Sequence, residues 1–226
     1  VGRQLSDVLL APPSDVVVAF FQMVITGELI RGILISLKPL LIAFGLSIII
    51  GVPIGILIGY YKRVAFFLEP LVNALYSTPL AALVPLVMLW FGMQTTGKVA
   101  FIFLIGIFPI IINTIAGVRN TDYELIEVSR SFNASWTRIL IEITVPYSVP
   151  FIFTGIRLGV GRAVVGMIVA EMYLALTGGL GHMVYAYGSS FSTANLFALL
   201  VVIPLIGISL TKLTLFIEYL ATPWRR

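Results

Sequence analysis

The chain has 226 residues, of which 59% are hydrophobic and 11% are charged, and its formal net charge is +4. A soluble domain carries about 25% charged residues, so this composition excludes a water-soluble globule and predicts a protein surrounded mostly by lipid. Cysteine is absent and His182 is the one histidine, which excludes a disulfide framework and a metal site built from several histidines and cysteines.

The N-terminal part predicts an interfacial helix followed by a membrane span. Residues 16–38 mix apolar residues with the charged side chains of Glu28, Arg31 and Lys38, so we expect a helix at the membrane surface. Residues 39–61 carry no charge, and because a bilayer-crossing helix needs about 20 apolar residues, they form the clearest span. The chain starts at Val1 rather than Met, which leaves a further N-terminal helix open.

Four more apolar segments follow, over residues 64–93, 99–118, 147–176 and 194–220. Pro79 predicts a kink in the first of them. Together they predict an all-α fold, a polytopic transmembrane helical bundle that forms a single domain over residues 1–226. We expect five spans in this chain, or six with a further N-terminal helix.

The basic residues predict the orientation of these spans. If the spans alternate, Lys62, the basic residues of segment 119–138 and Arg225 fall on one side, whereas Lys98 and His182 fall on the other. Since cytoplasmic loops carry an excess of lysine and arginine, segment 119–146 and the C-terminus are predicted to be cytoplasmic. The same flanking pattern favours membrane loops over a nucleic-acid surface as the reason for the positive charge.

Segment 119–146 is too polar to cross lipid, and its first half predicts a short amphipathic helix over residues 122–132. Leu125, Val128 and Phe132 recur at spacings of three and four, which places them on one helical face.

A second helix is predicted to begin at Ser135, an expected N-cap, and to end before Pro146. Asn133 lies between the two helices and tolerates the left-handed backbone of a tight turn. The pattern alone leaves two readings open: a rigid projection that docks in a partner's groove, or a helical loop packed on the membrane surface.

This segment resembles the EAA loop of permease subunits in bacterial ABC importers. The family pattern is Glu-Ala-Ala, three residues, Gly, nine residues, Ile, one residue and Leu-Pro. The matching positions, at every spacing, are Glu127-Val128-Ser129, Asn133, Ile143 and Val145-Pro146. The replacement of Gly by Asn133 keeps the turn at a modest conformational cost, and the Glu and the Pro are retained.

The resemblance covers nearly the whole chain and is to the nitrate/sulfonate/taurine branch of these type I importers. It is carried by Leu10-Ala11-Pro12-Pro13 with Gly27-Glu28-Leu29, Ser77-Thr78-Pro79 with Pro85, Leu89-Trp90-Phe91-Gly92, Gly155-Ile156-Arg157-Leu158, Ala170-Glu171-Met172 and Gly178-Gly179-Leu180-Gly181. The resemblance implies a permease of the bacterial cytoplasmic membrane.

The resemblance also implies partners. They are a second copy of the chain, two cytoplasmic ATPase subunits and an extracytoplasmic substrate-binding protein. The residues expected to contact the ATPase are Glu127, Val128, Ser129, Arg130, Asn133, Ala134 and Ser135. The chain has no Gly-x4-Gly-Lys-Ser/Thr sequence, so we expect no enzymatic activity and no cofactor in it, with ATP and Mg bound by the ATPase.

Three ionisable residues lie within the apolar segment 147–176: Arg157, Arg162 and Glu171. An ionisable group in lipid is costly unless it faces protein or water, so each one either lines a pathway or forms an ion pair. Arg157 and Glu171 are separated by about 21 Å along one helix, so their partners must lie on other helices or on the second subunit. Tyr76 and Ser77 are further candidates for a pathway, although such polar residues often bond to a neighbouring helix.

The sequence therefore predicts the permease subunit of an ATP-driven importer that moves a small solute by alternating access. The branch suggests an organic or inorganic anion such as a sulfonate or nitrate. The alternatives are a neutral vitamin precursor as the substrate, a secondary transporter driven by an ion gradient, and a membrane scaffold without transport.

Overall fold

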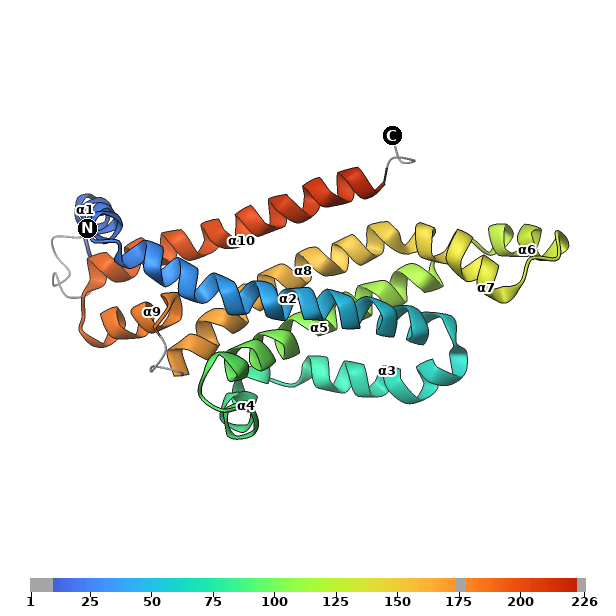
Figure 1. Ribbon diagram of the computed structural model, residues 1–226, viewed down its shortest axis with the longest axis horizontal. Helices are drawn as coiled ribbons and strands as arrows, with labels where there is room; N and C mark the ends of the chain where they lie inside the picture. Colours follow the sequence, from blue (N-terminus) through green and yellow to red (C-terminus); the bar gives the residue numbers. More distant parts are fainter. Residues whose placement is uncertain (1–9, 174–177, 223–226) are drawn as a thin grey trace. The chain divides into compact units, whose positions relative to one another are not determined.

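The computed structural model describes residues 10–173 and 178–222, which fold into helices joined by short turns (Figure 1). In chain order the helices are α1 (Pro13–Ile25), α2 (Glu28–Tyr60), α3 (Lys62–Ser77), the 3₁₀ turn η1 (Leu80–Leu83), α4 (Val84–Phe91), α5 (Thr95–Arg119), α6 (Tyr123–Ser131), α7 (Trp136–Ile139), the π-helical turn η2 (Leu140–Thr144), α8 (Val145–Tyr173), α9 (Leu180–Ser189) and α10 (Thr193–Ala221). These ranges contain no strand, which confirms the all-α fold. The basic C-terminal residues Arg225 and Arg226, which contribute to the predicted orientation, lie outside the described residues.

Within residues 10–173 and 178–222, four helices are long and apolar enough to cross a membrane: Glu28–Tyr60, Thr95–Arg119, Trp136–Tyr173 and Thr193–Ala221. A fifth span results if the bent pair α3 and α4 is counted as one, in agreement with the five that we expect. The predicted kink at Pro79 is a break, because α3 ends at Ser77 and Thr78 has an extended backbone.

The predicted interfacial helix over residues 16–38 is wrong in its bounds. α1 ends at Ile25, and Gly27 has a φ of 74°, the left-handed conformation that commonly ends a helix. α2 then starts at Glu28, so Arg31 and Lys38 belong to the first long helix. The location of α1 at the membrane surface stays a prediction.

The helices form two compact units, and each of the four long helices contributes residues to both. The first unit comprises Val1–Ala43, Ala81–Ile102 and Ala163–Leu210, and the second comprises Phe44–Leu80, Phe103–Arg162 and Thr211–Arg226. The core of the second unit is a cluster of buried apolar side chains from α2, α3 and α5 that includes Ile58, Val72 and Ile111.

In the second unit, three glycines of α2 let its backbone approach α5 closely. A Cβ atom at Gly51, Gly55 or Gly59 would lie 3.2, 2.5 or 2.7 Å from side-chain atoms of α5. Small residues at such spacings let helices pack in lipid, where the hydrophobic effect contributes little between helices. The approach is closest at Gly55, where a Cβ would also lie 2.9 Å from the Ile111 carbonyl oxygen.

Gly55→Ala is expected to destabilise the chain by about 1–3 kcal/mol, because the added methyl group must displace α5. Gly45→Ala is the matched control on the same helix, since a Cβ there meets nothing within 4 Å. It should be neutral or raise stability by up to about 1 kcal/mol through helix propensity. Thermal unfolding of the purified chain in detergent measures both, and equal effects of the two variants would contradict the close approach.

Candidate functional site

Segment 119–146 contains two short helices, α6 and α7, joined by a tight turn at one end of α8 (Figure 1). The Asp122 carboxylate caps α6 by accepting a hydrogen bond from the Glu124 backbone N–H at 2.9 Å. The Ser135 hydroxyl oxygen caps α7 by accepting one from the Arg138 N–H at 3.3 Å. Asn133 has a φ of 59°. The two helices, the Ser135 cap and the left-handed turn at Asn133 are therefore confirmed.

Backbone hydrogen bonds close this turn. The Asn133 N–H donates to the Arg130 carbonyl at 2.8 Å, and the Ala134 N–H donates to the Ser129 carbonyl at 3.0 Å. The Ser129 hydroxyl donates to the Leu125 carbonyl of its own helix at 2.7 Å. These predicted coupling residues thus shape the turn, and their contact with an ATPase stays a prediction.

One face of the α6 segment is apolar and exposed to solvent. Leu125, Val128 and Phe132, which the sequence places on one face, are all exposed, Phe132 by 83%. Glu127 is also exposed and forms no ion pair with the rest of the described chain. Because the segment is too polar for lipid, this patch is a surface suited to a protein partner.

α7 continues without a break into α8, so the predicted end of this helix before Pro146 is wrong. The π-helical turn η2 makes the continuity possible. In it the Val145 N–H bonds to the Leu140 carbonyl, five residues earlier, instead of following the α-helical pattern. Proline has no N–H to donate, and the altered ladder before Pro146 accommodates that loss within a continuous helix.

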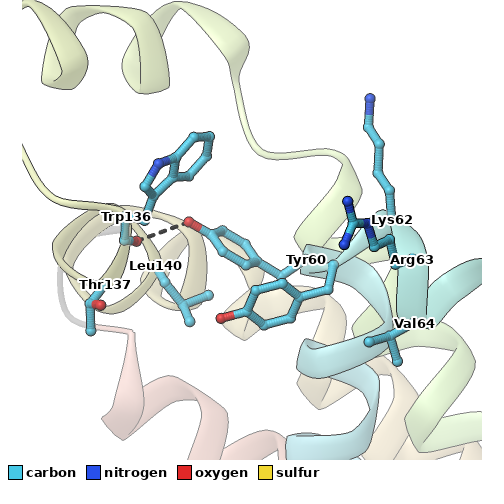
Figure 2. A pocket seen from close by; sticks show the side chains of 8 residues that line it. Tyr60, Lys62, Arg63, Val64, Trp136, Thr137 and Leu140 are labelled. Atoms are coloured by element: carbon cyan, nitrogen blue, oxygen red, sulfur yellow. Dashed lines mark hydrogen bonds between the residues drawn. The ribbon is translucent and has the colours of Figure 1, made fainter.

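Trp136, the first residue of α7, contacts both α6 and the last turn of α2. The Arg130 guanidinium carbon lies 4.2 Å from the centre of the Trp136 ring. The Tyr60 ring packs edge-on at 6.5 Å, and its hydroxyl donates a 2.9 Å hydrogen bond to the Trp136 carbonyl (Figure 2). Beside these contacts is a cavity of about 730 Å³, lined by Tyr60, Tyr61, Lys62, Arg63, Val64, Trp136, Thr137 and Leu140.

Arg157 has a structural partner within the chain. Its guanidinium forms an ion pair with Glu218 of α10 and donates to the Thr154 hydroxyl at 3.0 Å. Both charges are half-buried, so the pair neutralises two ionisable groups that would otherwise be costly in lipid. The expectation that its partner lies on another helix is confirmed.

Arg162 differs from Arg157, because it is exposed and forms no ion pair among the residues that the structure describes. Its guanidinium carbon lies 5.9 Å from the centre of the Tyr76 ring. The Ser77 hydroxyl instead bonds to the Ala74 carbonyl of its own helix at 3.0 Å. The structure thus brings Arg162 and Tyr76 together and leaves Ser77 bonded locally, while a pathway role for them stays a prediction.

Glu171 lies in a fully buried polar network of the first unit. Its carboxylate accepts a hydrogen bond from Lys98 Nζ at 3.0 Å, one from the Ser36 hydroxyl at 2.7 Å and one from the Gly181 N–H at 3.0 Å. Glu171 is 0% exposed and Lys98 is 2% exposed. The Ser36 oxygen in turn accepts the Leu180 N–H at 2.8 Å, and Lys98 also donates to the Gly178 carbonyl at 3.2 Å.

This network holds the first turn of α9 with side chains from other helices. Gly179, at the N-cap of α9, has no side chain to accept the free N–H groups, and Ser36 and Glu171 accept them instead. A Cβ at Gly179 would lie 2.4 Å from the Glu171 carboxylate, and one at Gly181 would lie 2.4 Å from the Ile168 carbonyl oxygen. These glycines are therefore needed for close approach.

α9 has a second attachment to the first turn of α2. The Tyr187 hydroxyl donates to the Glu28 carboxylate at 2.6 Å. Partial burial, followed by the neighbouring Glu28, raises the pKa of Tyr187 well above its usual value. Tyr187 therefore remains a protonated donor over the whole physiological pH range.

Sequence reasoning missed Lys98, Ser36 and Glu218 as partners, and Tyr60 and Trp136 as contacts of the loop. Lys98 is placed in a polar turn by its sequence neighbours, although the structure buries it in the first turn of α5. One sequence signal could have revealed that a partner exists. Glu171 lies inside an apolar segment without a neighbouring basic residue, so it requires a cation from elsewhere.

Comparisons with known proteins agree with this architecture. The model of one protein family, described as the binding-protein-dependent transport system inner membrane component, matches residues 51–226. A Methanocaldococcus jannaschii protein, whose name places it among ABC transporter permeases, is 37% identical over 202 residues, which cover 89% of this chain and 75% of that protein. The taurine transport system permease protein of Escherichia coli is 29% identical over 225 residues, covering 97% of this chain and 82% of that protein.

A solved structure shares the fold. A chain of the MetNI methionine ABC transporter, in an inward facing conformation, matches with a TM-score of 0.72 over 86% of this chain and 96% of that chain. The sequence identity is 18%, so this likeness concerns the fold alone.

The buried network yields a stability prediction. Glu171→Gln or Lys98→Met leaves one buried charge without its partner and should destabilise the chain by about 3–5 kcal/mol, whereas the double variant should lose less than either single variant. The control is Glu69→Gln, which removes one partner of the Glu69–Arg119 pair; because its side chains are 33% and 44% exposed, the loss should be about 0–1 kcal/mol. Thermal unfolding in detergent measures all four, and a double variant as unstable as the sum of the singles would contradict the pairing.

Proposed function

The chain belongs to the family of binding-protein-dependent transport system inner membrane components, and from this membership and the geometry of α6 and α7 we propose that it is the membrane-spanning subunit of an ATP-driven importer. The family is one of transport permeases. In this proposal a separate subunit carries out ATP hydrolysis. A second copy of the chain, two ATPase subunits with bound ATP and Mg, and an extracytoplasmic binding protein complete the proposed assembly.

The observation that carries the proposal is an exposed apolar face on a rigid projection, with the exposed carboxylate of Glu127 on another side of the same short helix. Leu125, Val128 and Phe132 stay uncovered in the chain alone, although the polar segment that bears them cannot enter lipid. An ATPase subunit that holds α6 in a groove covers this face and places a basic or hydrogen-bonding group opposite the Glu127 carboxylate. The segment and the C-terminus lie in the cytoplasm in this proposal, where ATP is available.

The continuity of α7 with α8 supports the mechanical part of the proposal. A docked α6 that moves with the ATPase displaces α7, and because no loop separates α7 from α8, the displacement reaches a membrane-spanning helix. Alternating access then follows from rigid-body movement of spanning helices.

The proposed substrate is a small anion. Arg162 supports this, because it is an exposed cation at the middle of a long helix that crosses the membrane, and the Tyr76 ring flanks it. A cation that has no acidic partner within the described part of the chain is costly in lipid, and a water-filled pathway that attracts anions would account for it. The likeness to a taurine permease, a protein named for a sulfonate, is in line with this class.

Glu127→Lys should abolish ATP-dependent uptake in vesicles that contain the chain, its ATPase and its binding protein, because the reversed charge opposes docking. Co-purification of the ATPase should fall by about tenfold or more, as expected for loss of an interfacial charged contact. Glu142→Gln is the control, since this exposed carboxylate pairs with Arg138 on its own segment. Uptake by the chain alone, driven by an ion gradient without ATPase, would contradict the proposal and favour a secondary transporter.

Arg162→Gln should lower the maximal rate of taurine or nitrate uptake by about tenfold, equivalent to about 1.4 kcal/mol. The apparent KM should change little, because affinity resides in the proposed binding protein. Arg162→Lys, which keeps the charge, should retain most of the rate. Equal rates for all three chains, measured with radiolabelled substrate, would argue for a neutral substrate.

A further inference from the structure

Trp136 contacts both α6, the helix proposed to dock on the ATPase, and the long helix α2. We define the aromatic joint as Arg130, Trp136 and Tyr60, which come from α6, α7 and the last turn of α2. The Trp136 side chain is 63% exposed, so its position depends on these few contacts rather than on a surrounding core. Arg130 lies over its ring at 4.2 Å and Tyr60 packs edge-on at 6.5 Å.

The hydrogen bond of the joint is made to the backbone of α7. The Trp136 carbonyl accepts the Leu140 N–H of its own helix. It also accepts the Tyr60 hydroxyl at 2.9 Å, the hydrogen bond drawn in Figure 2. Because the acceptor is a backbone atom, a rigid-body movement of α7 carries the acceptor with it, and Tyr60 must follow for the bond to be kept. Ring rotation of Trp136 does not relieve that constraint.

A cavity lies beside the joint. Its volume is about 730 Å³, and its lining includes Thr137 and Leu140 from the α7 side and Tyr61 and Val64 from the corner between α2 and α3. Tight packing transmits displacement and empty space does not. The Tyr60–Trp136 contacts therefore bridge a gap that side-chain packing leaves unfilled (Figure 2).

We propose that Tyr60 and Trp136 are positioning residues that carry the movement of α6 to the corner between α2 and α3, in addition to the continuous path through η2 into α8. The proposal rests on docking of α6 to an ATPase. In it, two membrane-spanning helices respond to one docking event, α8 through the covalent chain and α2 through the aromatic joint.

Tyr60→Phe tests the proposal with minimal change, because it removes only the hydroxyl group. Reconstituted with the ATPase and the binding protein, this variant should bind the ATPase normally and hydrolyse ATP. Uptake per ATP hydrolysed should fall about threefold to tenfold, the range expected for one lost neutral hydrogen bond. Trp136→Ala should show a larger fall, and Trp136→Phe, which keeps an aromatic ring, a smaller one. Tyr61→Phe is the matched control on the neighbouring residue and should leave the ratio unchanged.

A spectroscopic signature separates transmission from simple stability. The chain has three tryptophans, so Trp90→Phe with Trp224→Phe leaves Trp136 as the remaining one. With 5-fluorotryptophan in the permease alone, its fluorine resonance should shift when the ATPase and ATP are added. Tyr60→Phe should reduce that shift, whereas Tyr61→Phe should preserve it.

Two results would overturn the proposed role of the aromatic joint. One is an unchanged ratio of uptake to ATP hydrolysis in both Tyr60→Phe and Trp136→Ala, and the other is loss of ATPase binding in Tyr60→Phe. The second would make the joint part of the docking surface rather than a transmitter. Failure of the proposed function is distinguishable, since the unmodified chain would then take up solute along an ion gradient without any ATPase. If Trp136→Ala does not fold, Tyr60→Phe decides.

Discussion

An apolar solvent requires every buried charge to find its partner inside the protein, and the pair Lys98 and Glu171 meets this requirement at the ends of several helices. Each charge is unfavourably placed with respect to the dipole of its own helix. The cation Lys98 is in the first turn of α5, and the anion Glu171 is near the last turn of α8. Their positions are explained by what they hold. Glu171 supplies an anion to the N-terminus of α9, and Ser36 of α2 completes the capping of that helix.

Local signals made the coupling segment predictable from its sequence. Helix caps and left-handed turns depend on residues within about four positions, so Ser135 and Asn133 act in the structure as their residue types imply. Two helix boundaries were nevertheless predicted wrongly, the bounds of the helix over residues 16–38 and the helix end before Pro146. Gly27 ends a helix inside the predicted stretch 16–38, and a π-helical turn carries the chain past Pro146, where a proline alone suggested a stop.

Pairings over long sequence distances could not be predicted in this way. Lys98 and Glu171 are 73 positions apart, and Tyr60 and Trp136 are 76 apart. The apolar sequence around Glu171 indicates that this acid needs a cationic partner, but it does not identify the partner. Lys98 follows polar residues, as a solvent-exposed turn residue does, so its sequence context gives no sign that it is buried. Arg157 posed the same problem, and its partner Glu218 lies on the last helix. Helix existence and span number follow from hydrophobicity, whereas the helix contacts that give the protein its mechanics depend on the three-dimensional arrangement.

The close approach of Gly179 to Glu171 makes the residue types allowed at these two positions depend on each other. Its missing side chain leaves the space that the Glu171 carboxylate occupies, and its φ of 108° excludes most replacements independently. A lineage that retains the acid at 171 is therefore confined to glycine at 179. Loss of the acid would remove this attachment of α9 and relax the steric limit at 179, but the left-handed backbone would still favour glycine there.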